Sequence, residues 1–272
     1  MMRRTRLRRR SARQSRLTLG PALLAFWLVV PLVPLLMWAV SSRWSGASRL
    51  PQDWGLRGWQ EALDAGMLPA LTRSWVLGVA VALIATPLGA MAGRALGWRL
   101  LRRPALPSLV LLAPVVLAPI AVAMGLDVVI LRLRIPGEAA VVLVLSVFAL
   151  PYTTFTMRAT YLGLDPALEE QARVLGASSR QARRRVTLPA ATAGLVTATG
   201  LAFLVGWSDY AVTLLIGGGQ IVTAPMLIGS SAAGSGNDAL TSTLALSASL
   251  PPLVALALFT YAASRRRTAA HS

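Results

Sequence analysis

The chain is dominated by apolar blocks that are long enough to cross a lipid bilayer. A bilayer core is about 30 Å thick, so a helix that crosses it needs about 20 apolar residues. Only 14% of the residues are charged, whereas a soluble domain of this size carries about 25%. The sequence therefore predicts an all-α membrane protein with six transmembrane helices. We expect them at about 19–40, 74–96, 107–126, 139–157, 189–216 and 239–263.

The arginines indicate which side of the membrane each connecting segment faces. All 27 basic residues are arginine, and they gather at the ends of the apolar blocks. That placement is typical of a topology signal rather than of a nucleic-acid-binding surface. With both termini in the cytoplasm, 21 arginines face the cytoplasm and six face outside. We therefore expect both termini inside and no nucleic-acid partner. The six outside are Arg43, Arg49, Arg57, Arg73, Arg132 and Arg134.

The residue types that the chain lacks limit its chemistry. A Walker A loop needs a lysine that reaches the nucleotide phosphates, and the chain has no lysine. We therefore expect the glycine run 217–219 to be a turn. The chain has no cysteine, and its one histidine, His271, lies next to the C-terminal residue. We expect no catalytic residue and no metal site.

The blocks divide the chain into a tail, a first helix, an external loop and a membrane core. The first apolar block is too long for the core of a signal peptide, so we expect an uncleaved helix. Tryptophans in the external loop favour the membrane–water interface, and residues 58–65 resemble a short amphipathic helix. The expected parts are the arginine-rich cytoplasmic tail 1–18, the helix 19–40, the external loop 41–70, the core 71–262 and the cytoplasmic tail 263–272.

One long charged segment, residues 164–189, interrupts the core on the cytoplasmic side. Asp165 is a good N-cap for a helix, and proline is favoured immediately after such a cap. Gly176 is placed to end that helix in the left-handed conformation. Ser178 or Ser179 can cap a second short helix. Two short helices are therefore predicted to meet at a glycine between two membrane helices.

This segment resembles the EAA loop of the permease subunits of type I ABC importers. The family signature is Glu-Ala-Ala, three residues, Gly, nine residues, and then an aliphatic residue, any residue, Leu and Pro. Gln171 replaces the first alanine, which is a mild departure. The positions that match at the family's spacing are Glu170, Ala172, Gly176, Val186, Leu188 and Pro189.

The resemblance covers about residues 71–262 and implies the MetI-like fold of a bacterial inner-membrane permease. In that family the loop forms a coupling helix that docks on an ATPase subunit. The implied partners are two copies of an ATPase subunit, a second permease subunit and an extracytoplasmic substrate-binding protein. ATP and Mg²⁺ would be bound by the ATPase, and this chain would bind no cofactor. The implied coupling residues are Glu169, Glu170, Ala172, Gly176, Ala177, Val186, Leu188 and Pro189.

A second likeness bears on the substrate. Residues 207–213, followed by residues 223–225, resemble permeases of the polyamine branch, although iron, thiamine and sulfate permeases share much of this pattern. The resemblance implies a polyamine or a similar small solute, and a second permease that is a different chain. Asp209 is the one acid well inside a predicted membrane helix. It either lines the translocation pathway or packs near the outer surface.

Two other classes of membrane protein are alternatives. A secondary transporter or channel that works alone would need ionisable residues near the middle of the membrane, and only Asp209 qualifies. A membrane-embedded enzyme would need histidine, cysteine or paired acids in its membrane helices, and the predicted helices contain none of these. Composition and spacing therefore favour the permease.

Overall fold

The computed structural model describes residues 26–27, 29–44, 48–234 and 237–269. The predicted N-terminal tail lies outside these residues, and so do residues 19–25 and 28 of the predicted first helix. The chain divides into two units. The first comprises residues 1–65 and 231–247, and the second comprises residues 66–230 and 248–272.

The first unit contains the last part of the predicted first helix, which is α2 (Leu32–Ala39), and the short elements that follow it. These are β1 (Ser41–Arg43), β2 (Asp53–Trp54) and α3 (Arg57–Asp64). The rings of Trp38 and Trp44 lie 4.4 Å apart. The antiparallel strand pair was not expected, because strands of two and three residues are too short to show an alternating pattern.

The helix α3 confirms the prediction of a short helix at about 58–65. Gly58 on this helix lies against the backbone of Ala239 and the side chain of Thr243. Asn237 donates a hydrogen bond to the Glu61 carboxylate, and Arg57 forms a 2.7 Å ion pair with it. These two partners hold the pKa of Glu61 below its usual value, because both stabilise the ionised form.

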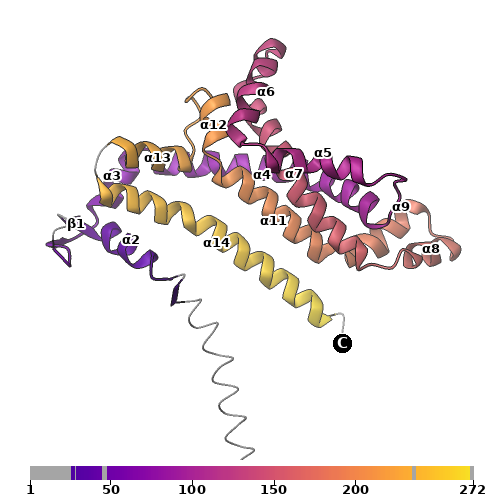
Figure 1. The fold of residues 1–272 in the computed structure, drawn as a ribbon. Helices are drawn as coiled ribbons and strands as arrows, with labels where there is room; N and C mark the ends of the chain where they lie inside the picture. Colours follow the sequence, from indigo (N-terminus) through magenta and orange to yellow (C-terminus); the bar gives the residue numbers. More distant parts are fainter. Residues whose placement is uncertain (1–25, 28, 45–47, 235–236, 270–272) are drawn as a thin grey trace, which may run out of the picture. The chain divides into compact units, whose positions relative to one another are not determined.

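The second unit is helical and includes all the elements that carry the candidate sites (Figure 1). The helices α4, α7 and α11 pack side by side. Residues 231–247 of α13 and α14 belong to the first unit. The helices are α4 (Met67–Gly97), α5 (Ala105–Val116), α6 (Pro119–Leu133), α7 (Gly137–Leu162), α8 (Ala167–Val174), α9 (Ser179–Ala182), the π-helix η1 (Arg183–Thr187), α10 (Leu188–Ala190), α11 (Thr192–Ser208), α12 (Ala211–Ile216), α13 (Ala224–Gly234) and α14 (Asp238–Ala269).

A row of glycines brings α4 and α7 into direct backbone contact. Small residues spaced by four let two membrane helices approach closely. A Cβ atom on Gly93 would lie 2.6 Å from the Cβ of Met157 and 2.8 Å from the carbonyl oxygen of Thr154. The contacts advance in the same direction along both helices, so the two helices are parallel. Gly89, Gly93 and Gly97 meet, in that order, Thr153, Met157 and Tyr161.

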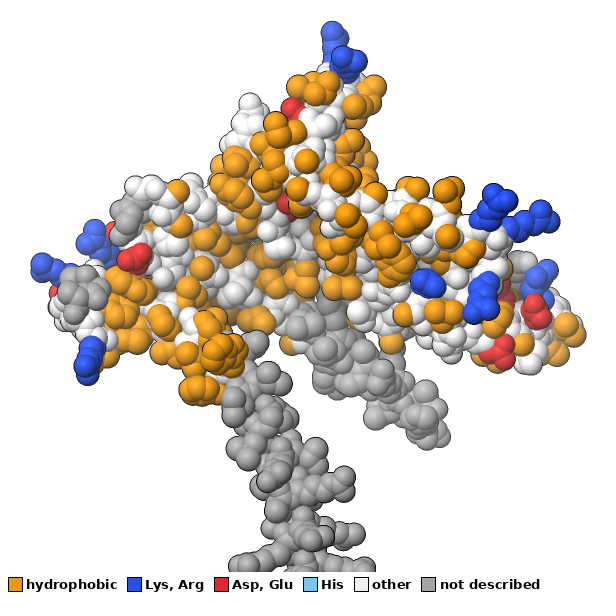
Figure 2. Space-filling model, in the orientation of Figure 1, with side chains coloured by type: hydrophobic (Ala, Val, Ile, Leu, Met, Phe, Trp, Pro, Cys, Tyr) orange, Lys and Arg blue, Asp and Glu red, His pale blue; other side chains and the backbone are white. Residues whose placement is uncertain are grey.

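The helix α11 completes the packed centre of the second unit. Gly78 of α4 lies against the ring of Phe203, which stacks on Trp207 at 5.8 Å. The indole nitrogen of Trp207 donates a 3.2 Å hydrogen bond to the carbonyl oxygen of Ala248. Many apolar side chains of α5 and α6 are instead uncovered, and Figure 2 shows them as hydrophobic surface. Such surface suits contact with lipid.

Two of the predicted membrane helices are not continuous. The predicted helix 107–126 is wrong, because α5 ends at Val116 and α6 begins at Pro119 with a 103° bend. Proline disfavours a helical conformation in the residue before it, and Ala118 is extended with ψ of 126°. The predicted helix 189–216 is interrupted at Ala191, where the bend is 74°, and again at Asp209.

The described residues contain two single helices that are long and apolar enough to cross a membrane, α4 and α7. The number rises to four if each bent pair is one span. Six spans are therefore not established by the structure. The helix α14 occupies the place of the predicted sixth span, from Asp238 to Ala269.

The contact at Gly93 is testable by a small substitution. We expect Gly93→Ala to destabilise the solubilised protein by about 1–3 kcal/mol, because the new methyl group would meet Met157 and backbone atoms of α7. Gly125→Ala on α6 is the matched control, since a Cβ there meets nothing within 4 Å. It should be neutral or stabilising by up to about 1 kcal/mol. Thermal unfolding in detergent measures both, and equal effects would contradict the close approach.

Candidate functional site

The first short helix of the charged segment is α8, and local hydrogen bonds define both of its ends. The Asp165 carboxylate accepts a 2.9 Å hydrogen bond from the backbone nitrogen of Ala167, as expected of a capping residue. At the other end Gly176 is left-handed, with φ of +91°. Its backbone nitrogen donates to Arg173, and that of Ala177 donates to Ala172, both at 3.0 Å. This pattern is a Schellman motif, and it confirms the predicted glycine ending.

The second short helix begins at a capping box. Of the two candidate serines, Ser178 is the cap: its hydroxyl accepts from the backbone nitrogen of Gln181 at 3.3 Å. The Gln181 side chain accepts in return from the backbone nitrogen of Ser178 at 2.9 Å. The helix α9 then continues as the π-helix η1 into α10. The charged segment is thus joined through helical turns to the start of α11.

A buried carboxylate anchors α8 to the membrane helices. Both oxygens of Glu169 lie 2.9 Å from the Nη2 atom of Arg94, near the end of α4. The hydroxyl of Thr187, in the π-helix, donates a 2.7 Å hydrogen bond to the same carboxylate. The Glu169 side chain is 11% exposed and that of Arg94 is 22% exposed. Glu169 therefore links three segments that are far apart in the sequence.

Arg94 is a functional candidate that the sequence alone did not single out. The signal was its position between Gly93 and Gly97, inside an apolar block, where a charged side chain needs a partner. Its guanidinium also lies over the ring of Trp98, 4.6 Å from the centroid. The Trp98 indole donates a 3.3 Å hydrogen bond to the carbonyl oxygen of Leu164, at the start of the charged segment.

The opposite face of α8 is uncovered. Val174 and Leu175 are each 87% exposed, which is unusual for adjacent apolar residues at a helix end. Beside them lies a hollow of about 590 Å³. Figure 2 shows charged side chains of both signs at this end of the second unit. The residues that line the hollow are Glu170, Arg173, Val174, Ala177, Ser178 and Ser179.

The structure divides the predicted coupling residues into three groups. Glu170 and Ala177 line the hollow, while Gly176 forms the turn between the two short helices. Glu169 points inward to Arg94. The predicted residues of the closing motif, Val186, Leu188 and Pro189, lie in the π-helix and α10, and none of them lines the hollow. Ala172 is half-buried on α8.

Asp209 lies at the break between α11 and α12. Its carboxylate accepts hydrogen bonds from the backbone nitrogen of Thr213 at 2.8 Å and from the Thr213 hydroxyl at 3.0 Å. These bonds satisfy a free donor at the start of α12, so Asp209 has a local structural function. A role in lining the pathway stays a prediction.

The glycine run 217–219 forms a turn, as predicted. Gly218 and Gly219 have positive φ values of 58° and 74°. The loop that follows is attached to α4, because the backbone nitrogen of Ala224 donates a 2.9 Å hydrogen bond to the hydroxyl of Ser74.

Comparison with known protein families identifies the family of this chain. Residues 85–269 match the family described as the binding-protein-dependent transport system inner membrane component. The match covers the charged segment together with most of the helices that hold it. The chain belongs to this family.

The chain is also similar in sequence to individual permeases of named transport systems. The chain is 35% identical over 171 residues to the trehalose transport system permease protein SugB of Mycobacterium tuberculosis, which is 58% of this chain and 59% of that protein. It is 27% identical over 202 residues to the putative 2-aminoethylphosphonate transport system permease protein PhnV of Salmonella paratyphi A, covering 73% of this chain and 76% of that protein.

A solved structure shares the fold. A chain of a bacterial ABC transporter involved in the import of the acidic polysaccharide alginate aligns with a TM-score of 0.67 at 15% identity. The alignment covers 92% of this chain and 97% of that chain. The predicted permease fold is thereby confirmed.

The two adjacent glutamates of α8 should differ in their effect on stability. We expect Glu169→Ala to lower the free energy of unfolding by about 2–3 kcal/mol, because it leaves the partly buried Arg94 without its carboxylate. Glu170→Ala is the matched control and should change it by less than about 0.5 kcal/mol, since that side chain is exposed. Thermal unfolding of the solubilised chain measures both. A larger loss for Glu170→Ala would contradict the anchoring geometry.

Proposed function

We propose that this chain is the membrane-spanning permease subunit of an ABC importer and forms part of the translocation pathway. The observation that carries the proposal is the way in which the charged segment 164–189 is held. One face of α8 is fixed to α4 and η1 through Glu169, while the other face is uncovered and offers apolar and charged side chains to a partner. Family membership supports the same function.

The proposed mechanism is alternating access driven by a partner. Two copies of an ATPase subunit close on ATP and Mg²⁺, and the segment that contains α8 moves with the copy to which it is docked. Glu169 transmits that movement to α4 through Arg94 and to α11 through Thr187 and η1. This chain catalyses no bond-making step and binds no cofactor in the proposal. A substrate-binding protein delivers solute on the outer side of the inner membrane, and a second permease subunit, a different chain, completes the pathway.

The proposed cargo is a small polar solute. The likeness of residues 207–213 to the polyamine branch supports a polyamine, whereas the relatives are named for trehalose and 2-aminoethylphosphonate transport. Spermidine, trehalose and 2-aminoethylphosphonate therefore form the first panel for a binding screen. In this proposal Asp209 is the candidate pathway residue, and a cationic cargo would favour its carboxylate.

The alternative function is a secondary transporter or channel that works without an ATPase. Isolation of the tagged chain from its native membrane distinguishes the two. We expect an ATP-binding subunit to co-purify, and liposomes that contain the assembly to take up solute only with ATP and the binding protein. ATP-independent uptake by the chain alone would overturn the importer proposal.

The turn at Gly176 provides a test of coupling. We expect Gly176→Ala to reduce ATP-driven uptake about fivefold or more while membrane insertion is retained, because alanine is strained at a φ of +91° and the two short helices would meet at a different angle. Gly163→Ala is the matched control, since Gly163 has a φ of −88° that alanine adopts readily.

Uptake and ATPase activity should be measured on the same preparation. Retained ATP hydrolysis with lost uptake is the expected result for Gly176→Ala. Normal uptake by this variant would rule out the coupling assignment, and equal losses in both glycine variants would point to general misfolding instead.

A further inference from the structure

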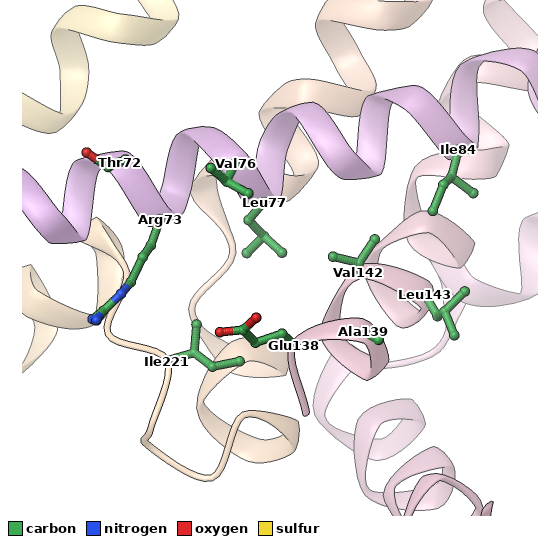
Figure 3. Close-up of a pocket in the computed structure, with 10 residues that line it drawn as sticks. All are labelled: Thr72, Arg73, Val76, Leu77, Ile84, Glu138, Ala139, Val142, Leu143 and Ile221. Atoms are coloured by element: carbon green, nitrogen blue, oxygen red, sulfur yellow. The ribbon is translucent and has the colours of Figure 1, made fainter. Parts of the chain in front are cut away.

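A groove of about 470 Å³ lies between α4, α7 and the loop that follows α12. It begins near the N-terminal ends of α4 and α7, whereas the charged segment 164–189 lies near their C-terminal ends. Figure 3 shows side chains from the two helices and from Ile221 converging on it. The lining residues are Thr72, Arg73, Val76, Leu77, Ile84, Glu138, Ala139, Val142, Leu143 and Ile221.

The body of the groove is apolar and long. The lining residues of α4 extend from Thr72 to Ile84, and at 1.5 Å per residue this is about 18 Å, or somewhat more than half the thickness of a bilayer core. Val76 is 64% exposed and Leu143 is 47% exposed, so the described residues leave the apolar wall uncovered. The length and the lining both suit a hydrocarbon chain that enters from one leaflet.

Two opposite charges stand at the mouth of this apolar groove. Arg73 and Glu138 both project to the same side of α4 in Figure 3. Among the residues that the structure describes, neither side chain has a hydrogen bond or an ion pair, and the two do not pair with each other. A guanidinium and a carboxylate that lie apart complement a ligand with both an anionic and a cationic group.

We propose that this groove binds a zwitterionic aminophospholipid, such as phosphatidylethanolamine. The phosphate would lie at Arg73 and the ammonium group at Glu138, with one acyl chain along Leu77, Val142 and Ile84. A lipid accounts for both parts of the site, because a small polar solute would satisfy the charges but leave the apolar wall uncovered. The proposal does not depend on the importer function.

Lipid retention by the full-length chain tests the site, in whatever assembly it purifies with. Nanodiscs of phosphatidylcholine are prepared with small amounts of phosphatidylethanolamine, and retained lipid is counted by native mass spectrometry after detergent exchange. We expect Arg73→Gln and Glu138→Gln each to reduce retention of phosphatidylethanolamine about tenfold. Ala139→Trp, which fills the groove, should abolish it.

Matched controls keep the result specific. Arg132→Gln and Asp64→Asn remove exposed charges elsewhere, and Leu83→Trp enlarges an exposed side chain of α4 outside the groove. These variants should retain the lipid. Phosphatidylglycerol, which has the phosphate without the amine, should bind at least about fivefold more weakly to the wild-type chain and be insensitive to Glu138→Gln.

Free phosphoethanolamine distinguishes the lipid from a soluble ligand with the same charged groups. We expect it not to displace the lipid at millimolar concentration, because it lacks the acyl chain. Displacement would identify a solute site and overturn the proposal. Equal retention by wild type and Ala139→Trp would overturn it as well, and so would occupation of the groove by a second permease subunit in the purified assembly.

Discussion

The ion pair and the hydrogen bond of the buried Glu169 carboxylate are the interactions on which the charged segment of the second unit depends. The carboxylate accepts from Arg94 and Thr187, so one side chain joins α4, α8 and the π-helix. A carboxylate in such a position is costly unless its partners are all in place. The Glu169 contacts therefore fix the orientation of α8 relative to the ends of the membrane helices. The direction in which the uncovered face of α8 points is fixed as a result. Capping at Ser178 and the turn at Gly176 refine that placement locally.

Much of this arrangement could be predicted, because its signals are local. The glycine ending at Gly176, the serine cap and the short helix α3 each follow from a few neighbouring residues. The apolar blocks likewise predicted α4 and α7. The broken helices could not be read from hydropathy, since a proline such as Pro119 is tolerated in many continuous membrane helices. Only the packing decides where such a helix bends.

The candidate sites likewise divide into features that local sequence predicts and features that depend on long-range packing. The residues around Glu170 that are predicted to dock follow a sequence spacing, and the structure adds which of them are uncovered. The pairing of Arg94 with Glu169 spans 75 residues, so neither periodicity nor capping rules identify it. The groove at Arg73 and Glu138 also needs the parallel packing of α4 and α7 before its two charges come to one opening. Function that depends on long-range contacts becomes visible only in three dimensions.

The glycine row between α4 and α7 has a mechanical consequence. Where glycines on one helix let the other approach this closely, few side-chain rotamers can change to absorb a displacement. The two parallel helices are then a stiff rod, and α4 alone, with its 31 residues, is about 46 Å long. In the proposed mechanism, a displacement of α8 at one end reaches the other end through this helix pair. A lipid wedged at that far end would act as a brake on the same rod.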